Sequence, residues 1–295
     1  MSFSSEQKNS IIEKACKSPC CRRAILTGVL FAKAYLKDAD IELSIEKRDV
    51  CLYIVRLIRE FYGTDAQITR DVSGGRRYLI TFKSKSATDY IVSISDRENL
   101  FVAKCDGCAG AFLRGVFLAS GRASDPKTAY SIHFSLGVRA EKFIECLNSL
   151  GLSPMLSGSG ENSVVYFTNG SSIEDFYGTA GMNRAMFEII DERMEAEIRK
   201  KAARVSNCEM NNIKKAIDAA GKQYDIILAL EKANLLSSLP DDLESTARLR
   251  LLHKDMSLSQ LAAISTPPIS KPGLSHRLKK IMEIGEKLLH RNTNE

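Results

Sequence analysis

Hydrophobic and polar residues follow a mixed pattern over the first 180 positions and a purely helical pattern afterwards. Apolar residues three and four apart predict helices over 6–17, 19–36 and 49–62, the last ending at Gly63. Alternation from Ile41 to Glu46 predicts a strand, and residues 65–70 and 76–83 predict two more, joined at Ser73-Gly74-Gly75. From Met182 two long helices are predicted, over 182–203 and 207–236. We therefore expect an α+β part followed by an all-α part.

The same order of elements recurs 87 residues later. Leu26-x-Gly28-Val29-x-Phe31-Ala32 aligns with Leu113-x-Gly115-Val116-x-Leu118-Ala119, each within a helix of small and apolar residues. After the second of these helices (107–121), the pattern predicts a strand at 130–134, a helix at 138–150 and strands near 152–156 and 163–168. This repeat indicates an internal duplication. Because glycine inside a helix costs roughly 1 kcal/mol relative to alanine, we expect Gly28 and Gly115 to permit a close helix crossing at a pseudo-twofold axis.

Near the C-terminus, the pattern predicts a helix at about 240–253, a short second helix, a turn and a longer third helix with a basic outer face. Ser257 and Gln260 form a predicted capping box at the start of the second helix, and Ser270 is the predicted cap of the third. Pro267-Pro268 separates the two helices. The inward face of the third helix comprises Leu274, Leu278, Ile281, Gly285 and Leu288.

This layout is typical of a helix-turn-helix DNA-binding unit. The first turns of a recognition helix contact bases, which favours Lys271, Ser275, His276 and Arg277, whereas Lys279 and Lys280 suit phosphate contacts. The predicted DNA-binding residues are Ser257, Ser270, Lys271, Ser275, His276, Arg277, Lys279 and Lys280. The alternative interpretation is an amphipathic helical hairpin with a solvated basic face.

Composition narrows the class of protein without deciding the function. The net charge is +6, with 23 basic against 20 acidic residues in positions 1–180 and 19 against 16 in the remainder. This mild excess fits DNA binding through a defined patch rather than through a polybasic coat. No signal-peptide core and no apolar run of ~18 residues occurs, so we expect no membrane partner. The eight scattered cysteines predict a reducing cytoplasm, and no motif for a small-molecule substrate is evident.

Several motifs together resemble a known family. The helix Leu113–Gly121 resembles the LAGLIDADG helix of homing endonucleases. With Cys20-Cys21-Arg22-Arg23-Ala24, Asn207-Cys208-Glu209, and Ser270-Lys271 followed by His276-Arg277-Leu278, the chain resembles the WhiA family. The resemblance implies an α+β fold, in which a duplicated LAGLIDADG-like domain with a pseudo-twofold precedes an all-α helix-turn-helix domain resembling sigma-factor region four. The expected divisions are 1–100 and 101–181 for the two halves, 182–237 for a helical linker and 238–291 for the DNA-binding domain.

The resemblance also implies a function. Members of the family are transcription regulators of cell division, chromosome segregation and, in some lineages, sporulation. The implied partners are double-stranded DNA and a regulatory protein, and the implied location is the nucleoid within the cytoplasm. Two alternatives stay open at this point: an architectural chromosome-binding protein without promoter specificity, and a LAGLIDADG nuclease.

The residues at the nuclease positions argue against cleavage. A LAGLIDADG nuclease holds divalent metal with one acid near the end of each motif helix, and the aligned positions here are Lys33 and Ser120. Neither side chain can replace a carboxylate on Mg²⁺. Asp38 and Asp125 lie five residues further on, beyond the expected helix ends. We therefore predict no catalytic residues and no enzymatic activity.

The cysteines raise the question of a metal site. Cys21 and Cys108 are separated by the repeat length of 87, and Cys20 and Cys105 lie close to them in sequence. Structural zinc sites prefer a spacer of two to four residues between paired cysteines, which Cys20-Cys21 lacks. The sequence therefore favours buried small hydrophobic side chains, with no metal and no cofactor, over a zinc site.

Overall fold

The computed structural model describes residues 2–14, 16–70, 77–96 and 98–292. The chain divides into two compact units, residues 1–197 and 198–295. The predicted turn at Ser73-Gly74-Gly75 lies outside the described residues. Within the described residues, we find no helix that is both long enough and apolar enough to cross a lipid bilayer.

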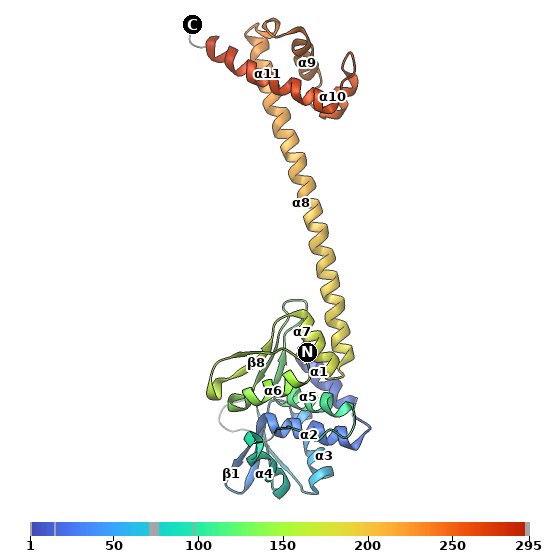
Figure 1. The fold of residues 1–295 in the computed structure, drawn as a ribbon, viewed down its shortest axis with the longest axis vertical. Coiled ribbons are helices and arrows are strands. Elements are labelled where there is room, and N and C mark those ends of the chain that lie inside the picture. The colour runs from blue at the N-terminus through green and yellow to red at the C-terminus, as the bar shows by residue number, and fades with distance from the viewer. Residues whose placement is uncertain (1, 15, 71–76, 97, 293–295) are drawn as a thin grey trace. The chain divides into compact units, whose positions relative to one another are not determined.

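The first half of unit 1 begins with two helices and continues into a small antiparallel sheet (Figure 1). The pattern-based helix at 49–62 is confirmed as α3, which ends where Gly63 adopts a left-handed φ of 64°. The elements of this half are α1 (Phe3–Glu13), α2 (Pro19–Lys33), β1 (Ala34–Lys37), β2 (Asp40–Ile45), α3 (Arg48–Tyr62), β3 (Gln67–Arg70), β4 (Tyr78–Phe82), α4 (Lys85–Val92) and η1 (Ile94–Asp96).

The second half of unit 1 repeats this arrangement. The two sheets have the strand orders β1-β2-β4-β3 and β5-β6-β8-β7, so equivalent strands occupy equivalent places. This confirms the predicted duplication. The elements of the second half are α5 (Gly107–Ser120), β5 (Gly121–Ala123), β6 (Ile132–Ser135), η2 (Gly137–Arg139), α6 (Ala140–Ser149), β7 (Met155–Ser157), η3 (Gly160–Asn162), β8 (Val164–Phe167) and α7 (Gly170–Thr179).

Strands β1 and β5 were not predicted, because each directly follows an apolar helix whose pattern runs on without a break. The backbone of Ala34 is extended, with ψ of 138°, and that of Gly121 is extended with ψ of 139°. Each short strand then pairs with the following strand, β1 with β2 and β5 with β6. Pairing with a strand further along the chain therefore ends each helix. Local hydrophobic periodicity does not reveal such pairing.

Helices α2 and α5 cross at the two glycines that the duplication singled out. A Cβ atom on Gly28 would lie 2.2 Å from the carbonyl oxygen of Phe112, and one on Gly115 would lie 2.0 Å from that of Ile25. The backbones thus approach too closely for any side chain at these positions. The crossing forms the centre of the unit 1 core, where Leu30, Phe31 and Phe117 are fully buried.

Helix α8 (Asn183–Lys232) is one continuous helix of 50 residues. The prediction of two helices with a break near residue 205 was therefore wrong. No glycine or proline interrupts residues 203–208, and Asn207, the expected first residue of the second helix, lies within α8. The remaining elements are η4 (Leu236–Ser238), α9 (Asp241–Leu252), α10 (Leu258–Ile264) and α11 (Lys271–Asn292).

The core of unit 2 is made by the last turns of α8 together with α9, α10 and α11. Helix α11 supplies Leu274, Leu278 and Ile281, each with no exposed surface. At Gly285 it passes close to α8, because a Cβ there would lie 2.9 Å from Ile226 and 3.0 Å from Leu230. The predicted inward face of this helix is confirmed at these positions.

Candidate nucleic-acid interface

The two helices of the expected DNA-binding unit begin at well-formed caps. The Ser257 hydroxyl accepts from the Gln260 backbone N–H at 3.4 Å, and Gln260 Oε1 accepts from the Ser257 N–H at 3.0 Å, which completes the predicted capping box. The Ser270 hydroxyl accepts from the Gly273 N–H at 3.2 Å. Both serine oxygens are therefore engaged in fixing where α10 and α11 start.

The outer face of α11 is polar and basic. Opposite the buried leucines lie side chains that are all solvent-exposed, namely Lys271, Ser275, His276, Lys279 and Lys280. The ammonium group of Lys279 lies 4.0 Å from Glu283, one turn further on. This pair is well exposed, so it contributes little stability and leaves Lys279 able to contact a phosphate.

Arg277 is placed differently from the other predicted contacts. Its guanidinium lies against the start of α9, with Nε 3.5 Å from the carboxylate Oδ2 of Asp242. The Arg277 side chain is 29% exposed, against 77% for Lys279. A base contact by Arg277 therefore requires this ion pair to open.

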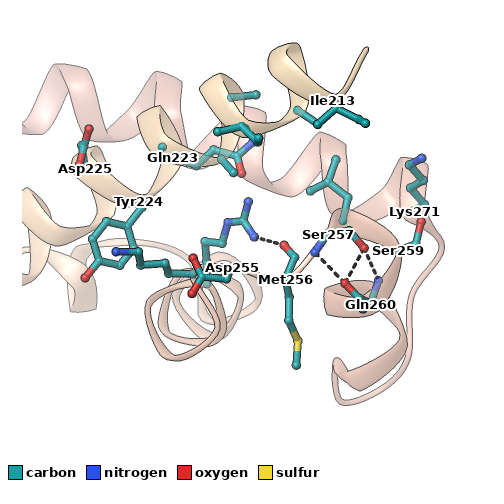
Figure 2. A pocket seen from close by; sticks show the side chains of 18 residues that line it. Ile213, Gln223, Tyr224, Asp225, Asp255, Met256, Ser257, Ser259, Gln260 and Lys271 are labelled. Atoms are coloured by element: carbon teal, nitrogen blue, oxygen red, sulfur yellow. Dashed lines mark hydrogen bonds between the residues drawn. The ribbon is translucent and has the colours of Figure 1, made fainter. Parts of the chain in front are cut away.

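Alongside α10 runs a groove of about 710 Å³ (Figure 2). One wall is the α8 segment from Ile213 to Asp225, and the other is the α9–α10 turn with Met256 and Ser257. Arg250 also lines the groove and donates to the Met256 carbonyl oxygen at 2.6 Å. This arginine was not predicted, because it stands in the last turn of α9 and belongs to no motif.

The positions aligned with the nuclease acids lie at matching ends of the two crossing helices. Lys33 is the last residue of α2, and Ser120 is the last residue of α5. The Lys33 ammonium group donates to the Ser135 carbonyl oxygen at 3.0 Å, and the Ser120 hydroxyl donates to the Val116 carbonyl oxygen at 3.0 Å. Among the described residues, no group of three or more His, Cys or acidic side chains gathers at these helix ends.

Basic side chains surround the ends of α2 and α5, at a site that we name the basic hollow. It is a cavity of about 40 Å³ lined by Lys8, Lys33, Ser44, Glu46, Arg77, Ala119, Ser120, Gly121, Arg122 and Ser135. Neither Asp38 nor Asp125 is among the lining residues. Lys8, Arg77 and Arg122 were not predicted, because they come from separate segments and share no motif.

One acidic residue balances part of this charge. Glu46 pairs with Arg122 and lies 3.9 Å from the guanidinium of Arg77. Burial opposes ionisation of Glu46, but Arg122, Lys8 and Arg77 outweigh it, so the pKa of that carboxyl is lowered. Burial is also the main cause that lowers the pKa of Lys33. The hollow carries more positive than negative side chains, which repels divalent cations and suits an oxyanion.

Lys8 provides a test of this charge balance. Its side chain is 7% exposed, and burial, with smaller effects from Lys47 and Arg122, lowers its pKa from 10.5 to about 8 against the opposing effect of Glu46. Below pH 8 the ammonium group is charged in both states, and its burial cost is fully present. Between pH 8 and 10.5 only the unfolded chain keeps the proton, so stability rises with pH.

We therefore expect Lys8→Met to raise the free energy of unfolding by about 2–3 kcal/mol at pH 7. The advantage should shrink above pH 8 and disappear near pH 10.5. Urea unfolding at several pH values measures this difference in stability. Lys14→Met, at the exposed end of α1, is the control and should change stability little. A gain that is independent of pH would contradict the assigned burial cost.

Both parts of the chain match described protein families. The WhiA LAGLIDADG-like domain matches residues 109–199, and the WhiA C-terminal HTH domain matches residues 202–285. The probable cell division protein WhiA of Caldicellulosiruptor saccharolyticus is 30% identical over 98% of this chain and 96% of its own length. The chain belongs to the WhiA family. A relative of the same name from Macrococcus caseolyticus is also 30% identical, over 98% of this chain and 97% of its own.

The fold agrees with a solved structure of the WhiA family. Full-length WhiA from Thermotoga maritima superposes with a TM-score of 0.61 and 21% identity, covering 97% of this chain and 99% of that chain. The α+β fold with a duplicated LAGLIDADG-like domain and a helical helix-turn-helix domain, expected from the sequence, is therefore confirmed. Both domain types fit DNA binding.

Proposed function

We propose that this WhiA-family chain is a DNA-binding transcription regulator of cell division and chromosome segregation, and of sporulation where the host forms spores. It binds promoter DNA on the nucleoid through α10 and α11 and acts with a regulatory protein partner. The observation that carries this proposal is the outer face of α11, where Ser275, His276, Lys279 and Lys280 are exposed opposite a fully buried face. A helix of this kind fits the major groove with its first turns toward the bases.

Unit 1 serves as a scaffold without nuclease activity. The basic hollow, with Lys33 and Ser120 at the ancestral acid positions, suits phosphate oxygens and not a divalent metal. A plasmid-nicking assay with Mg²⁺ or Mn²⁺ should therefore show no cleavage above the buffer control. Cleavage that is abolished by substitution at Lys33 or Ser120 would overturn this part of the proposal.

Base contacts and phosphate contacts should respond differently to substitution. His276→Ala should weaken binding to the cognate site by about 1–3 kcal/mol and leave nonspecific binding nearly unchanged. Lys279→Ala and Lys280→Ala should weaken binding on all sequences and reduce the salt slope by roughly 0.9 for each lost phosphate contact. Fluorescence anisotropy on a site selected from genome-wide binding, and on scrambled DNA, measures both effects across a salt series.

A matched lysine outside the interface serves as the control. Lys142 on α6 already pairs with Glu145 at 2.8 Å, so Lys142→Ala should leave DNA affinity unchanged. Equal losses on cognate and scrambled DNA for His276→Ala would instead indicate an architectural protein without promoter specificity. Genome-wide binding that survives deletion of residues 238–291 would show that the helix-turn-helix is not the DNA-binding element.

A further inference from the structure

Four cysteine sulfur atoms meet where the two crossing helices begin. Cys20 and Cys21 lie in the first turn of α2, Cys108 lies in the first turn of α5, and Cys105 lies just before α5. All four Sγ atoms lie within 4.8 Å of one another. Cys105 Sγ is 3.5 Å from that of Cys20, 3.4 Å from that of Cys21 and 3.6 Å from that of Cys108.

These separations match the edges of a tetrahedron around one metal ion. A zinc–sulfur bond of about 2.3 Å requires sulfur atoms about 3.8 Å apart in tetrahedral geometry. We propose that Cys20, Cys21, Cys105 and Cys108 bind a structural zinc ion that joins the two halves of the LAGLIDADG-like domain. The sequence argument against zinc was the adjacency of Cys20 and Cys21, and the structure removes it, because both sulfur atoms reach the same cluster.

The backbone around Cys105 and Cys108 holds both sulfur atoms at the cluster. The Cys108 N–H donates to the Cys105 carbonyl oxygen at 3.0 Å, which forms a tight turn, and the Lys104 N–H donates to Cys108 Sγ at 3.4 Å. A Cβ on Gly107 would lie 3.2 Å from Cys21 Sγ, so glycine leaves room for that sulfur.

The same geometry disfavours other thiol chemistry. In a four-iron cluster each cysteine binds a separate iron atom, which needs sulfur atoms spread more widely than this group allows. A disulfide would bring one pair to about 2.05 Å, whereas Cys105 is nearly equidistant from all three other sulfur atoms. The equal spacing therefore fits shared binding of one ion better than pairing of two cysteines.

The position of the cluster suggests its role. Cys20 and Cys21 belong to the first half of unit 1, whereas Cys105 and Cys108 belong to the second. The cluster lies at the starts of α2 and α5, and the basic hollow lies at their ends. Zinc would thus fix the crossing helices at the end away from the basic hollow.

The first experiment measures metal in the full-length chain purified under reducing conditions. Mass spectrometry of metal content should find about one zinc per chain, and apo-protein reloaded with Co²⁺ should show the absorption bands of a tetrahedral thiolate site. Cys105→Ser should lose most of the bound zinc and the cobalt spectrum. Because Cys105 is solvent-exposed, this variant should keep the circular dichroism spectrum of the folded protein.

The control is Cys208→Ser, which removes an exposed cysteine on α8 in unit 2 and should keep the full zinc content. A chelator should lower the thermal midpoint of the wild type and of Cys208→Ser, and leave that of Cys105→Ser unchanged. The proposal is overturned if the reduced wild type neither retains nor takes up zinc. It is also overturned if Cys105→Ser binds as much zinc as the wild type, or if mass spectrometry finds a disulfide within the cluster of the protein as isolated.

Discussion

Gly115→Ala is expected to lower the free energy of unfolding of unit 1 by about 3 kcal/mol. The added Cβ would lie 2.0 Å from the Ile25 carbonyl oxygen and 3.1 Å from the Gly28 Cα, both backbone atoms that no rotamer change can move. Helices α2 and α5 must separate to accept it, and every buried contact along the crossing loosens. Urea unfolding followed by circular dichroism measures the loss, and hydrogen exchange locates it on these two helices.

A glycine on α8 provides the matched control. Gly221 also lies inside a helix, but a Cβ there would meet nothing within 4 Å. Gly221→Ala should therefore raise helix stability by up to about 1 kcal/mol, because alanine is the better helix former. The two substitutions are chemically identical, so opposite signs isolate the steric effect. If Gly115→Ala also stabilised the protein, the close crossing would be wrong.

Arg250→Ala is the second substitution with a large expected effect, a loss of about 3 kcal/mol from unit 2. Arg250 is 1% exposed and lines the groove between α8 and the α9–α10 turn. Its removal leaves a cavity and breaks the hydrogen bond to the Met256 carbonyl oxygen. Since that turn precedes the cap of α10, DNA binding should weaken in parallel with folding, as thermal unfolding and anisotropy on the same samples would show.

Two variants separate the causes of this loss. Arg250→Met keeps most of the buried volume. It also removes a buried guanidinium, whose pKa is lowered by burial. The loss of stability should therefore be much smaller than that of Arg250→Ala. Arg248 lies on the same helix but is 55% exposed and pairs with Glu244 at 2.7 Å. Arg248→Ala should change stability by less than about 0.5 kcal/mol. Equal losses of stability in Arg248→Ala and Arg250→Ala would show that the burial of Arg250 does not stabilise unit 2.

The repeat made most of the fold predictable. The two glycines at a spacing of 87 residues indicated the helix crossing, because a costly residue inside a helix needs a packing reason. The capping box at Ser257 also followed from residue types three positions apart. What failed was the length of helices: α2 ends earlier than its pattern, and α8 continues through the expected break. Helix α2 ends early because the following residues pair as strand β1. Helix α8 continues because no helix-breaking residue interrupts residues 203–208.

The features missed from the sequence all depend on contacts between distant segments. Lys8, Arg77 and Arg122 meet only because α1 and both sheets converge at the ends of α2 and α5. From the sequence, Arg250 is expected to be a surface residue at the end of a helix. In the structure it is buried against the turn before α10. The cysteines were visible as a pattern, but chelation depends on the positions of the sulfur atoms, which residue spacing does not determine.

The charges of the basic hollow decide whether restored acids could form a metal site in this chain. Substituting Lys33 and Ser120 by acidic residues would not create a metal site. The basic side chains of Lys8, Arg77 and Arg122 would pair with the new carboxylates first. A metal site would therefore need further substitutions among these basic residues. Basic side chains outside the two aligned acid positions therefore keep divalent metal away from this part of unit 1.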